Sequence, residues 1–193
     1  QKVRTVEQIE NEYNQDKFKR CLDLYEESGG KMSSFELRMA IDRGGLDEEA
    51  DSVVDGALVC ATLREINDRR NQIILEALKP AAQRNETIVE LGAAFGFNLD
   101  FLAGHRPETR FVGADYSANA IDLAGRLFAS NPKMQFGRFN FYDETYPVLD
   151  TFDGPFTALT AQAIEQMPTA KPLIEALRRV RDRVSEVVQL EPN

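Results

Sequence analysis

The chain has 193 residues, of which 42% are hydrophobic and 28% charged, and its formal net charge at pH 7 is -9. This composition gives a domain of ordinary size enough apolar residues for a packed core and excludes wholesale disorder. The acidic balance argues against a general nucleic-acid binder, because such a protein needs a basic surface to displace counterions. We therefore do not expect nucleic acid as the partner.

The two cysteines, Cys21 and Cys60, are far apart in the sequence and form no CxxC motif. This spacing predicts neither a disulfide scaffold nor a structural metal site, and it fits a reducing compartment. No apolar run reaches the roughly 18–20 residues that span a bilayer. The polar segment Gln1–Glu10 also lacks the apolar core of a signal peptide. These features predict a cytoplasmic protein without membrane association.

The first part of the chain has a helical pattern. Apolar residues recur at spacings of three and four over Val6–Tyr25, which predicts a helix that ends at Ser28-Gly29-Gly30. A second helix is expected over Ser34–Asp42, and a third helical stretch from about Asp47 to Leu78. We interpret residues 1–84 as an N-terminal helical cap or lid.

The second part, residues 85–193, alternates between β-type and helical runs. The expected strands are 87–91, 110–115, 134–139, 152–160 and 185–190, and the expected helices are 98–103, 118–130 and 171–182. Alternating strands and helices predict an α/β fold, with a doubly wound, Rossmann-like parallel sheet and helices on both faces. Ligands of such sheets bind beyond the carboxyl ends of the strands.

The end of the first predicted strand is rich in small residues and reads Glu90-Leu91-Gly92-Ala93-Ala94-Phe95-Gly96-Phe97-Asn98. Glycines permit a tight turn and let the backbone approach a ligand closely, and the N-terminus of the next helix offers N–H groups. The dinucleotide fingerprint GxGxxG would require glycine at positions 94 and 97, and a P-loop would require GK(S/T). The sequence has neither.

Polar residues also end the later strands. Asp115 ends the second strand, Asp143 follows the third, Gln162 the fourth and Glu191 the fifth. Other readings stay open. Asp115 suits the N-cap of the next helix, Asp143 suits a turn, and Glu191 suits a solvated end. Likewise, Glu90 suits an ion pair and Tyr142 the core. The single histidine, His105, falls in a predicted loop, where we expect no catalytic role.

Together, these strand ends resemble the class I S-adenosylmethionine-dependent methyltransferases. Motif I of that family, (D/E)xGxGxG, is matched by Glu90, Gly92 and Gly96, and Ala94 stands in place of the middle glycine. The resemblance covers about residues 85–193. It implies a sheet of seven strands, of which this chain supplies five, and S-adenosylmethionine as the cofactor.

The resemblance also implies roles for single residues. Asp115 would bind the cofactor ribose, Asp143 would accept from the adenine amino group, and Gln162 would face the cofactor or substrate. Glu191 is a candidate catalytic base, and Tyr146 is a weaker one. The cofactor-binding residues expected in full are Glu90, Gly92, Ala93, Ala94, Gly96, Asn98, Asp115, Tyr116, Ser117, Tyr142, Asp143 and Gln162.

Three functions follow from these observations. The first is methyl transfer to an oxygen or nitrogen atom of a small molecule or sugar. The second is a nicotinamide-dinucleotide oxidoreductase, in which Asp115 would serve the ribose equally well. The third is a non-catalytic, methyltransferase-like module of a larger assembly. Five strands would leave the last one, 185–190, with an unpaired edge, so we expect the protein to continue past Asn193 or a partner chain to cover that edge.

Overall fold

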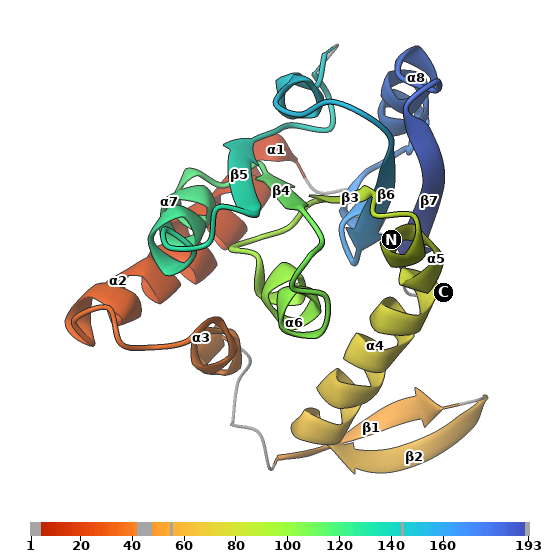
Figure 1. Cartoon of the computed structure of the whole chain (residues 1–193). Helices are drawn as coiled ribbons and strands as arrows, with labels where there is room; N and C mark the ends of the chain where they lie inside the picture. The colour runs from red at the N-terminus through yellow and green to blue at the C-terminus, as the bar shows by residue number, and fades with distance from the viewer. Residues whose placement is uncertain (1–4, 42–47, 55, 144, 192–193) are drawn as a thin grey trace.

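The computed structural model describes residues 5–41, 48–54, 56–143 and 145–191. Its centre is a five-stranded parallel sheet with the order β5-β4-β3-β6-β7 (Figure 1). The first strand of the sheet, β3, lies in the middle, and the chain builds outward on one side and then on the other. This is the Rossmann-type order, and it confirms the fold class predicted from the sequence.

The sheet strands lie within a few residues of their predicted positions. They are β3 (Thr87–Leu91), β4 (Phe111–Asp115), β5 (Met134–Arg138), β6 (Phe156–Ala161) and β7 (Val184–Leu190). Every residue of β3 and β6 is buried, as expected for the central strands of a sheet covered on both faces. Within the described residues, β7 pairs with β6 alone and is one edge of the sheet.

Helices cover both faces of the sheet. On one face, Ile88 of β3 packs with α4 (Leu63–Ala77), α5 (Lys79–Gln83) and α6 (Phe97–His105). On the other face, Val89 and Leu91 pack with η2 (Pro147–Asp150) and α8 (Lys171–Arg179). The alternation along β3 follows the two-residue period of a strand, and it places Glu90 on the α4–α6 side.

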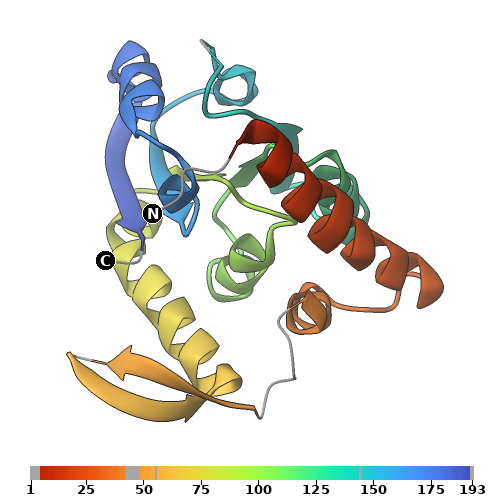
Figure 2. The ribbon, with the colours of Figure 1, turned by 180° about the vertical axis from the view of Figure 1, so that it is seen from behind.

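The N-terminal segment forms a third core beside α7 (Ala118–Leu127). Helices α1 (Val6–Ile9), η1 (Glu10–Phe18) and α2 (Lys19–Glu27) run on as one rod, followed by α3 (Ser34–Ile41) (Figure 2). Phe18 and Cys21 pack there with Leu37, Phe95 and Leu123. The helical pattern over 6–25 and its end at Ser28–Gly30 are confirmed. Helices α2 and α3 share a core with α7 and the loop after β3, and helices α4 and α5 share a core with the sheet, so these four helices pack against the strand domain.

The prediction of a helical stretch from about Asp47 to Leu78 was wrong in its first half. Strands β1 (Glu49–Val54) and β2 (Ala57–Thr62) pair in antiparallel fashion there, whereas positions 47 and 55 lie outside the described residues, as does Asp42. Helix α4 begins only at Leu63, after a capping box in which Thr62 and Glu65 bond each other's backbone N–H. That motif was the signal in the sequence that would have separated hairpin from helix.

Two smaller findings complete the fold. His105 is the last residue of α6 instead of a loop residue, and its Nδ1 lies 2.9 Å from the Phe101 carbonyl oxygen. Among the described residues, no helix combines the length and apolar character needed to cross a membrane.

The sheet contains a glycine whose missing side chain makes room for a ring. Gly113 of β4 pairs with Phe136 of β5, and a Cβ at Gly113 would lie 2.5 Å from that ring and 3.2 Å from Leu99 Cδ1. We predict that Gly113→Ala lowers the free energy of unfolding by about 1–3 kcal/mol, because the ring must shift in a packed core. Urea denaturation measures this.

Gly137→Ala is the matched control, because it also lies in a strand and its new Cβ would meet Val148 at an ordinary 3.5 Å. It should change stability by less than about 0.5 kcal/mol. Equal losses in the two variants would contradict the packing argument.

Candidate functional site

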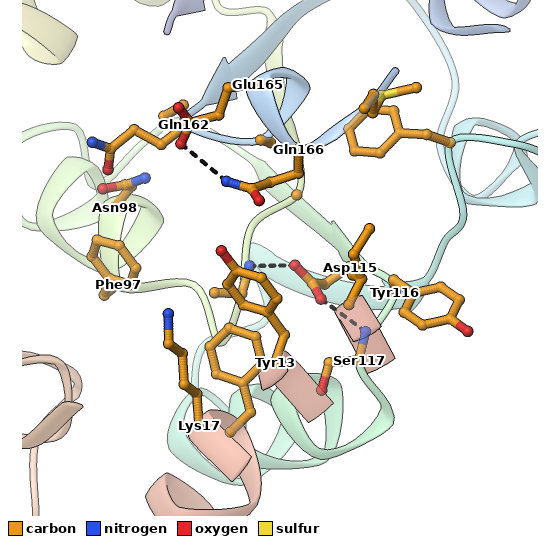
Figure 3. Close-up of a pocket in the computed structure, with 18 of the residues that line it drawn as sticks. Tyr13, Lys17, Phe97, Asn98, Asp115, Tyr116, Ser117, Gln162, Glu165 and Gln166 are labelled. Carbon is orange, nitrogen blue, oxygen red and sulfur yellow. Dashed lines mark hydrogen bonds between the residues drawn. The ribbon is translucent and has the colours of Figure 1, made fainter. Parts of the chain in front are cut away.

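A cavity of about 330 Å³ lies at the carboxyl ends of the central strands, within the usual size range of small-molecule sites. Its walls come from the loops after β3, β4, β5 and β6 and from the N-terminal helices (Figure 3). The position is the switch point between β3 and β6, where Rossmann-type sheets bind their ligands.

The loop after β3 has no room for larger side chains at its glycines. Gly92 has a φ of +83°, and a Cβ there would lie 2.5 Å from Ala163 Cβ in the loop after β6. Gly96 has a φ of +84°, and a Cβ there would meet the Phe136 ring at 2.6 Å. Gly92 lines the cavity, whereas Gly96 and the buried Ala93 shape the loop from beneath.

Ala94, the residue in place of the family's middle glycine, adopts a glycine-like backbone. Its φ is +50°, in the left-handed region, which costs roughly 1–2 kcal/mol for a residue with a Cβ. Backbone hydrogen bonds of Ala94 and of the two residues before it hold this strained conformation. The Gly92 and Ala93 N–H groups donate to the Ala114 carbonyl at 2.8 and 2.9 Å, and the Ala94 N–H donates to Asp115. Ala94 therefore adopts the positive φ that a glycine adopts easily, and it lies in the cavity wall.

Asp115 joins the loop after β3 to the start of α7. Its Oδ2 accepts from the Ala94 N–H and its Oδ1 from the Ser117 N–H, both at 2.8 Å (Figure 3). Burial raises the pKa of the Asp115 carboxyl, and these two backbone donors act in the opposite direction. Each carboxylate oxygen has a second lone-pair site, so Asp115 can accept further hydrogen bonds from a ligand in the cavity.

The N-cap of α7 is Ser117, and not Asp115. The Ser117 hydroxyl accepts from the Ala120 N–H at 3.1 Å, which removes the alternative reading of Asp115 as the cap. Ser117 and its neighbour Tyr116 both line the cavity.

Glu90 lies beneath the cavity at the end of a chain of polar contacts. Asn98 Nδ2 donates to Glu90 Oε1 at 2.5 Å, and Arg70 Nη2 donates to Asn98 Oδ1 at 3.0 Å. Glu90 is fully buried and does not line the cavity, whereas Asn98 and Arg70 do. Burial raises the pKa of Glu90 to about 7, against the opposing effects of Asn98 and Arg70.

The loop after β5 presents Asn140, Phe141 and Tyr142 to the cavity. Tyr142 is 42% exposed, so it is no core residue. Asp143 is exposed and lies outside the cavity wall. Its N–H donates to the Asn140 carbonyl, in a turn, and a contact of Asp143 with a ligand stays a prediction. Sequence reasoning passed over Asn140, the polar residue of this loop that faces the cavity.

The loop after β6 is held by Glu191. Gln162 has a φ of +56° and lines the cavity. The N–H groups of Ala163, Ile164 and Glu165 donate to the Glu191 carboxylate at 3.2–3.3 Å. Glu191 is not among the residues of the cavity wall, so the structure gives it the role of a positioning residue instead of a catalytic base.

Tyr146 is also remote from the cavity. Its hydroxyl donates to the Phe141 carbonyl at 2.9 Å, and burial raises its pKa to about 12. A phenol held in this way is no base at neutral pH, so the structure does not support this candidate.

The N-terminal helices contribute one wall of the cavity, and the sequence did not predict which of their residues line it. Tyr13 and Lys17 of η1 reach the cavity, as do Arg38 of α3 and Phe97 at the start of α6. Helix η1 is a nine-residue π-helix, a rare form that is frequent at functional sites. The periodic pattern showed which face of this helix is apolar, but it carried no information about what that face covers.

Asn14 of η1 attaches this wall to the strand ends. It is 6% exposed, and its Oδ1 accepts from the Ser117 hydroxyl at 2.6 Å and from the Asn119 N–H at 3.0 Å. The Asn119 side chain donates back to the Asn14 carbonyl at 2.9 Å. Through Ser117, the N-terminal wall is thus bonded to the same turn that holds Asp115.

Comparisons with known proteins come from solved structures. No protein-family model and no curated protein matches the chain. Three similar structures are PKMT2 from Rickettsia typhi in complex with AdoHcy, the plantazolicin methyltransferase BpumL in complex with a monoazolic desmethylPZN analog and SAH, and StiE O-MT. Their identities to this chain are 16%, 17% and 13%, and their TM-scores are 0.42, 0.45 and 0.48.

The likeness is partial in both directions. It covers 52%, 66% and 64% of this chain, but only 19%, 52% and 43% of the respective structures. This chain thus spans at most about half the length of these structures. Identity and TM-score are both low, so this likeness by itself assigns no function to the chain.

We predict that Asn14→Ala lowers the free energy of unfolding by about 2 kcal/mol. The substitution removes the acceptor of two donors near α7, including the buried Ser117 hydroxyl, and an unsatisfied buried donor costs about 1–3 kcal/mol. The neighbouring Gln15 is exposed and its side chain bonds Glu10, so Gln15→Ala should cost less than about 0.5 kcal/mol. Chemical denaturation measures the free energy of unfolding of both variants, and a similar decrease in the two would contradict the role of Asn14.

Glu90 predicts a pH dependence of stability. Its folded pKa of about 7 lies above the ordinary pKa of 4.5 for a glutamate carboxyl, so the folded chain holds this proton more tightly than the unfolded chain. The resulting stabilisation is complete below pH 4.5 and is lost as the pH rises through 7. Between pH 5.5 and pH 8 the loss is on the order of 2 kcal/mol. In Glu90→Gln, which cannot titrate, the unfolding free energy should fall less over this range by that amount.

Glu108→Gln is the control for this titration. The pKa of Glu108 is lowered by Lys133, so its effect falls below this pH window. Denaturation curves at several pH values compare the variants. A wild-type slope unchanged by Glu90→Gln would show that another group titrates.

Proposed function

We propose that the chain carries the cofactor site of an S-adenosylmethionine-dependent methyltransferase, which transfers a methyl group to an oxygen or nitrogen atom of a small molecule or sugar. The observation that carries the proposal is a convergence at one cavity. The turn with Gly92 and Ala94, the carboxylate of Asp115 and the loop with Tyr142 line the same 330 Å³ space. These elements come from three different strand ends, and they are the elements that the sequence resemblance singles out.

The residues present fit the nucleoside of this cofactor. Asp115 offers a carboxylate at the cavity wall, and charge-assisted hydrogen bonds to ribose hydroxyls contribute roughly 1.5–3 kcal/mol each. Gly92 leaves its side-chain position to Ala163, so backbone instead of side chain borders the cavity there. Phe141 and Tyr142 offer ring surfaces on the side where the adenine would lie.

Methyl transfer from this cofactor requires mainly that the acceptor be correctly positioned. When bound, the cofactor supplies a methyl group on a positively charged sulfur, which an acceptor atom displaces in line. The work of this chain is then to orient the acceptor and exclude water. Helix η1 covers one side of the cavity, with Tyr13 and Phe18 in its wall, and this cover suits the exclusion of water. We assign no base for the acceptor.

Asp115 alone would also suit a nicotinamide dinucleotide, since a carboxylate at the end of the second strand binds ribose in that class too. Two features argue against it. The fingerprint glycines are absent at positions 94 and 97, and Phe97 places a ring in the cavity wall at the start of α6. A methyltransferase-like module without activity shares the cofactor site, and a methyl-transfer assay separates the two.

We predict that the folded chain binds S-adenosylhomocysteine in isothermal titration calorimetry and that Asp115→Asn weakens the affinity about 10- to 100-fold. The reason is that two charge-assisted hydrogen bonds become neutral ones. Asp143→Asn removes the same charge from an exposed position outside the cavity and should leave the affinity within about twofold. Reduced nicotinamide dinucleotide is the competing ligand in a parallel titration.

Three outcomes oppose the proposal. A folded chain that does not bind S-adenosylhomocysteine overturns it, as does tighter binding of the dinucleotide. Equal losses in the Asp115 and Asp143 variants would show that the ligand is not held at the cavity described. Thermal unfolding curves confirm that each variant is folded.

A further inference from the structure

The N-terminal helices and the start of α6 give one side of the cavity an apolar surface. Five apolar or aromatic side chains line it and form what we call the apolar wall: Ile9 of α1, Tyr13 and Phe18 of η1, Ile41 of α3 and Phe97 of α6. Phe18 is buried, and the other four are half-buried. The half-buried side chains leave apolar area that a ligand can cover, and covering such area favours binding.

The basic side chains on the same side of the cavity are engaged within the protein. Lys17 Nζ lies 3.4 Å from Glu12 Oε1. The guanidinium carbons of Arg38 and Arg70 lie 4.6 and 5.5 Å from the centroid of the Phe97 ring, and both arginines have further contacts within the protein. Side chains of this kind lay their methylene stems along apolar surface. These basic residues therefore do not call for a charged ligand, and their stems extend the apolar wall.

The strand-end loops bring polar side chains to another side of the cavity. The loop after β6 supplies Gln162, Glu165 and Gln166, and the loop after β5 supplies Asn140. Figure 3 shows the three residues of the loop after β6 on the opposite side of the cavity from Tyr13. The cavity thus has an apolar side and a polar side, and a molecule with one polar end would bind in one orientation.

We infer that the methyl acceptor is an apolar molecule, whose ring or hydrocarbon body lies against the apolar wall and whose accepting oxygen or nitrogen faces the strand-end loops. The inference rests on the proposed function, because it assigns Asp115 and Tyr142 to the nucleoside of the cofactor. It narrows the acceptor to an apolar small molecule instead of a sugar. A sugar carries hydroxyls on all sides, and those against the apolar wall would lose their hydrogen bonds to water without replacement.

A homologous series of probes tests the apolar contact. Phenol, para-ethylphenol and para-butylphenol are titrated by calorimetry with and without saturating S-adenosylhomocysteine, and methyl glucoside is the sugar probe. The affinity should rise about two- to fourfold for each added methylene, and the heat capacity change of binding should become more negative along the series. Methyl glucoside should bind at least about tenfold more weakly than para-butylphenol.

Ile9→Gln tests whether the apolar wall is the surface that the alkyl chain covers. Ile9 is chosen because Tyr13, Ile41 and Phe97 also pack against the N-terminal core. The variant should weaken binding of para-butylphenol about 3- to 10-fold, because a polar group of similar size replaces apolar surface. Ile174→Gln is the matched control. Ile174 lies on α8, is 48% exposed and is outside the cavity wall, so its substitution should leave the probe affinities unchanged.

The outcomes separate this inference from the proposed function. Equal affinities along the alkyl series, a glucoside that binds as tightly as para-butylphenol, or equal effects of the two variants overturns the inference, while binding of S-adenosylhomocysteine still supports the cofactor site. Alkylphenols that S-adenosylhomocysteine displaces would assign the apolar wall to the cofactor and also overturn the inference. If S-adenosylhomocysteine does not bind to the folded chain, the proposed function fails, and the assignment of the apolar wall to a methyl acceptor fails with it.

Discussion

The carboxylate of Asp115 is the contact on which the ligand edge of this protein depends. One of its oxygens accepts from the Ala94 N–H after β3, and the other accepts from the Ser117 N–H before α7. Ser117 in turn donates to Asn14 in the N-terminal rod. Three segments separated by about 20 and by about 100 residues in the chain therefore meet through the side chains of Asp115 and Ser117. Burial raises the pKa of Asp115, and the two backbone donors act in the opposite direction.

Local strain is concentrated around the same cavity. Among the described non-glycine residues with positive φ, Ala94 and Gln162 both line it, whereas Asn85 lies in a turn elsewhere. Glu90, directly beneath, has one buried oxygen without a hydrogen-bond partner in the described protein. Each such feature costs of order 1–3 kcal/mol and persists only where the surroundings determine it. Hydrogen bonds within the loop after β3, and those from the loop after β6 to the Glu191 carboxylate, hold these strained residues in place.

The charge distribution divides the cavity into two sides with different origins. The strand-end loops contribute backbone groups, Asp115 and Glu165, whereas the N-terminal helices contribute Lys17, Arg38 and Arg70 with their aromatic neighbours.

The sequence by itself determined the order of strands and the residues at their carboxyl ends. Strand periodicity and glycine turns are local properties, and the parallel arrangement brings the strand ends to one edge without further information. For this reason Gly92, Asp115, Tyr142 and Gln162, which the sequence singles out, line one cavity. Asp143 lies outside that wall, because a turn residue and a ligand-facing residue have the same local signature. The strands Glu49–Val54 and Ala57–Thr62 were predicted as helix because their alternation is short and the capping box of Thr62 and Glu65 was not weighed.

Only the tertiary structure decided which N-terminal side chains reach the cavity and what Glu90 and Glu191 do. An apolar stripe on a helix shows which face is buried, but the surface it meets depends on contacts across about 100 residues, such as Asn14 with Ser117. The burial that raises the pKa of Glu90 also depends on residues that are distant in the sequence. The same holds for Glu191, whose carboxylate accepts from three N–H groups of the loop after β6. Such contacts exist only in the folded chain, because loop closure brings together groups that no local pattern relates.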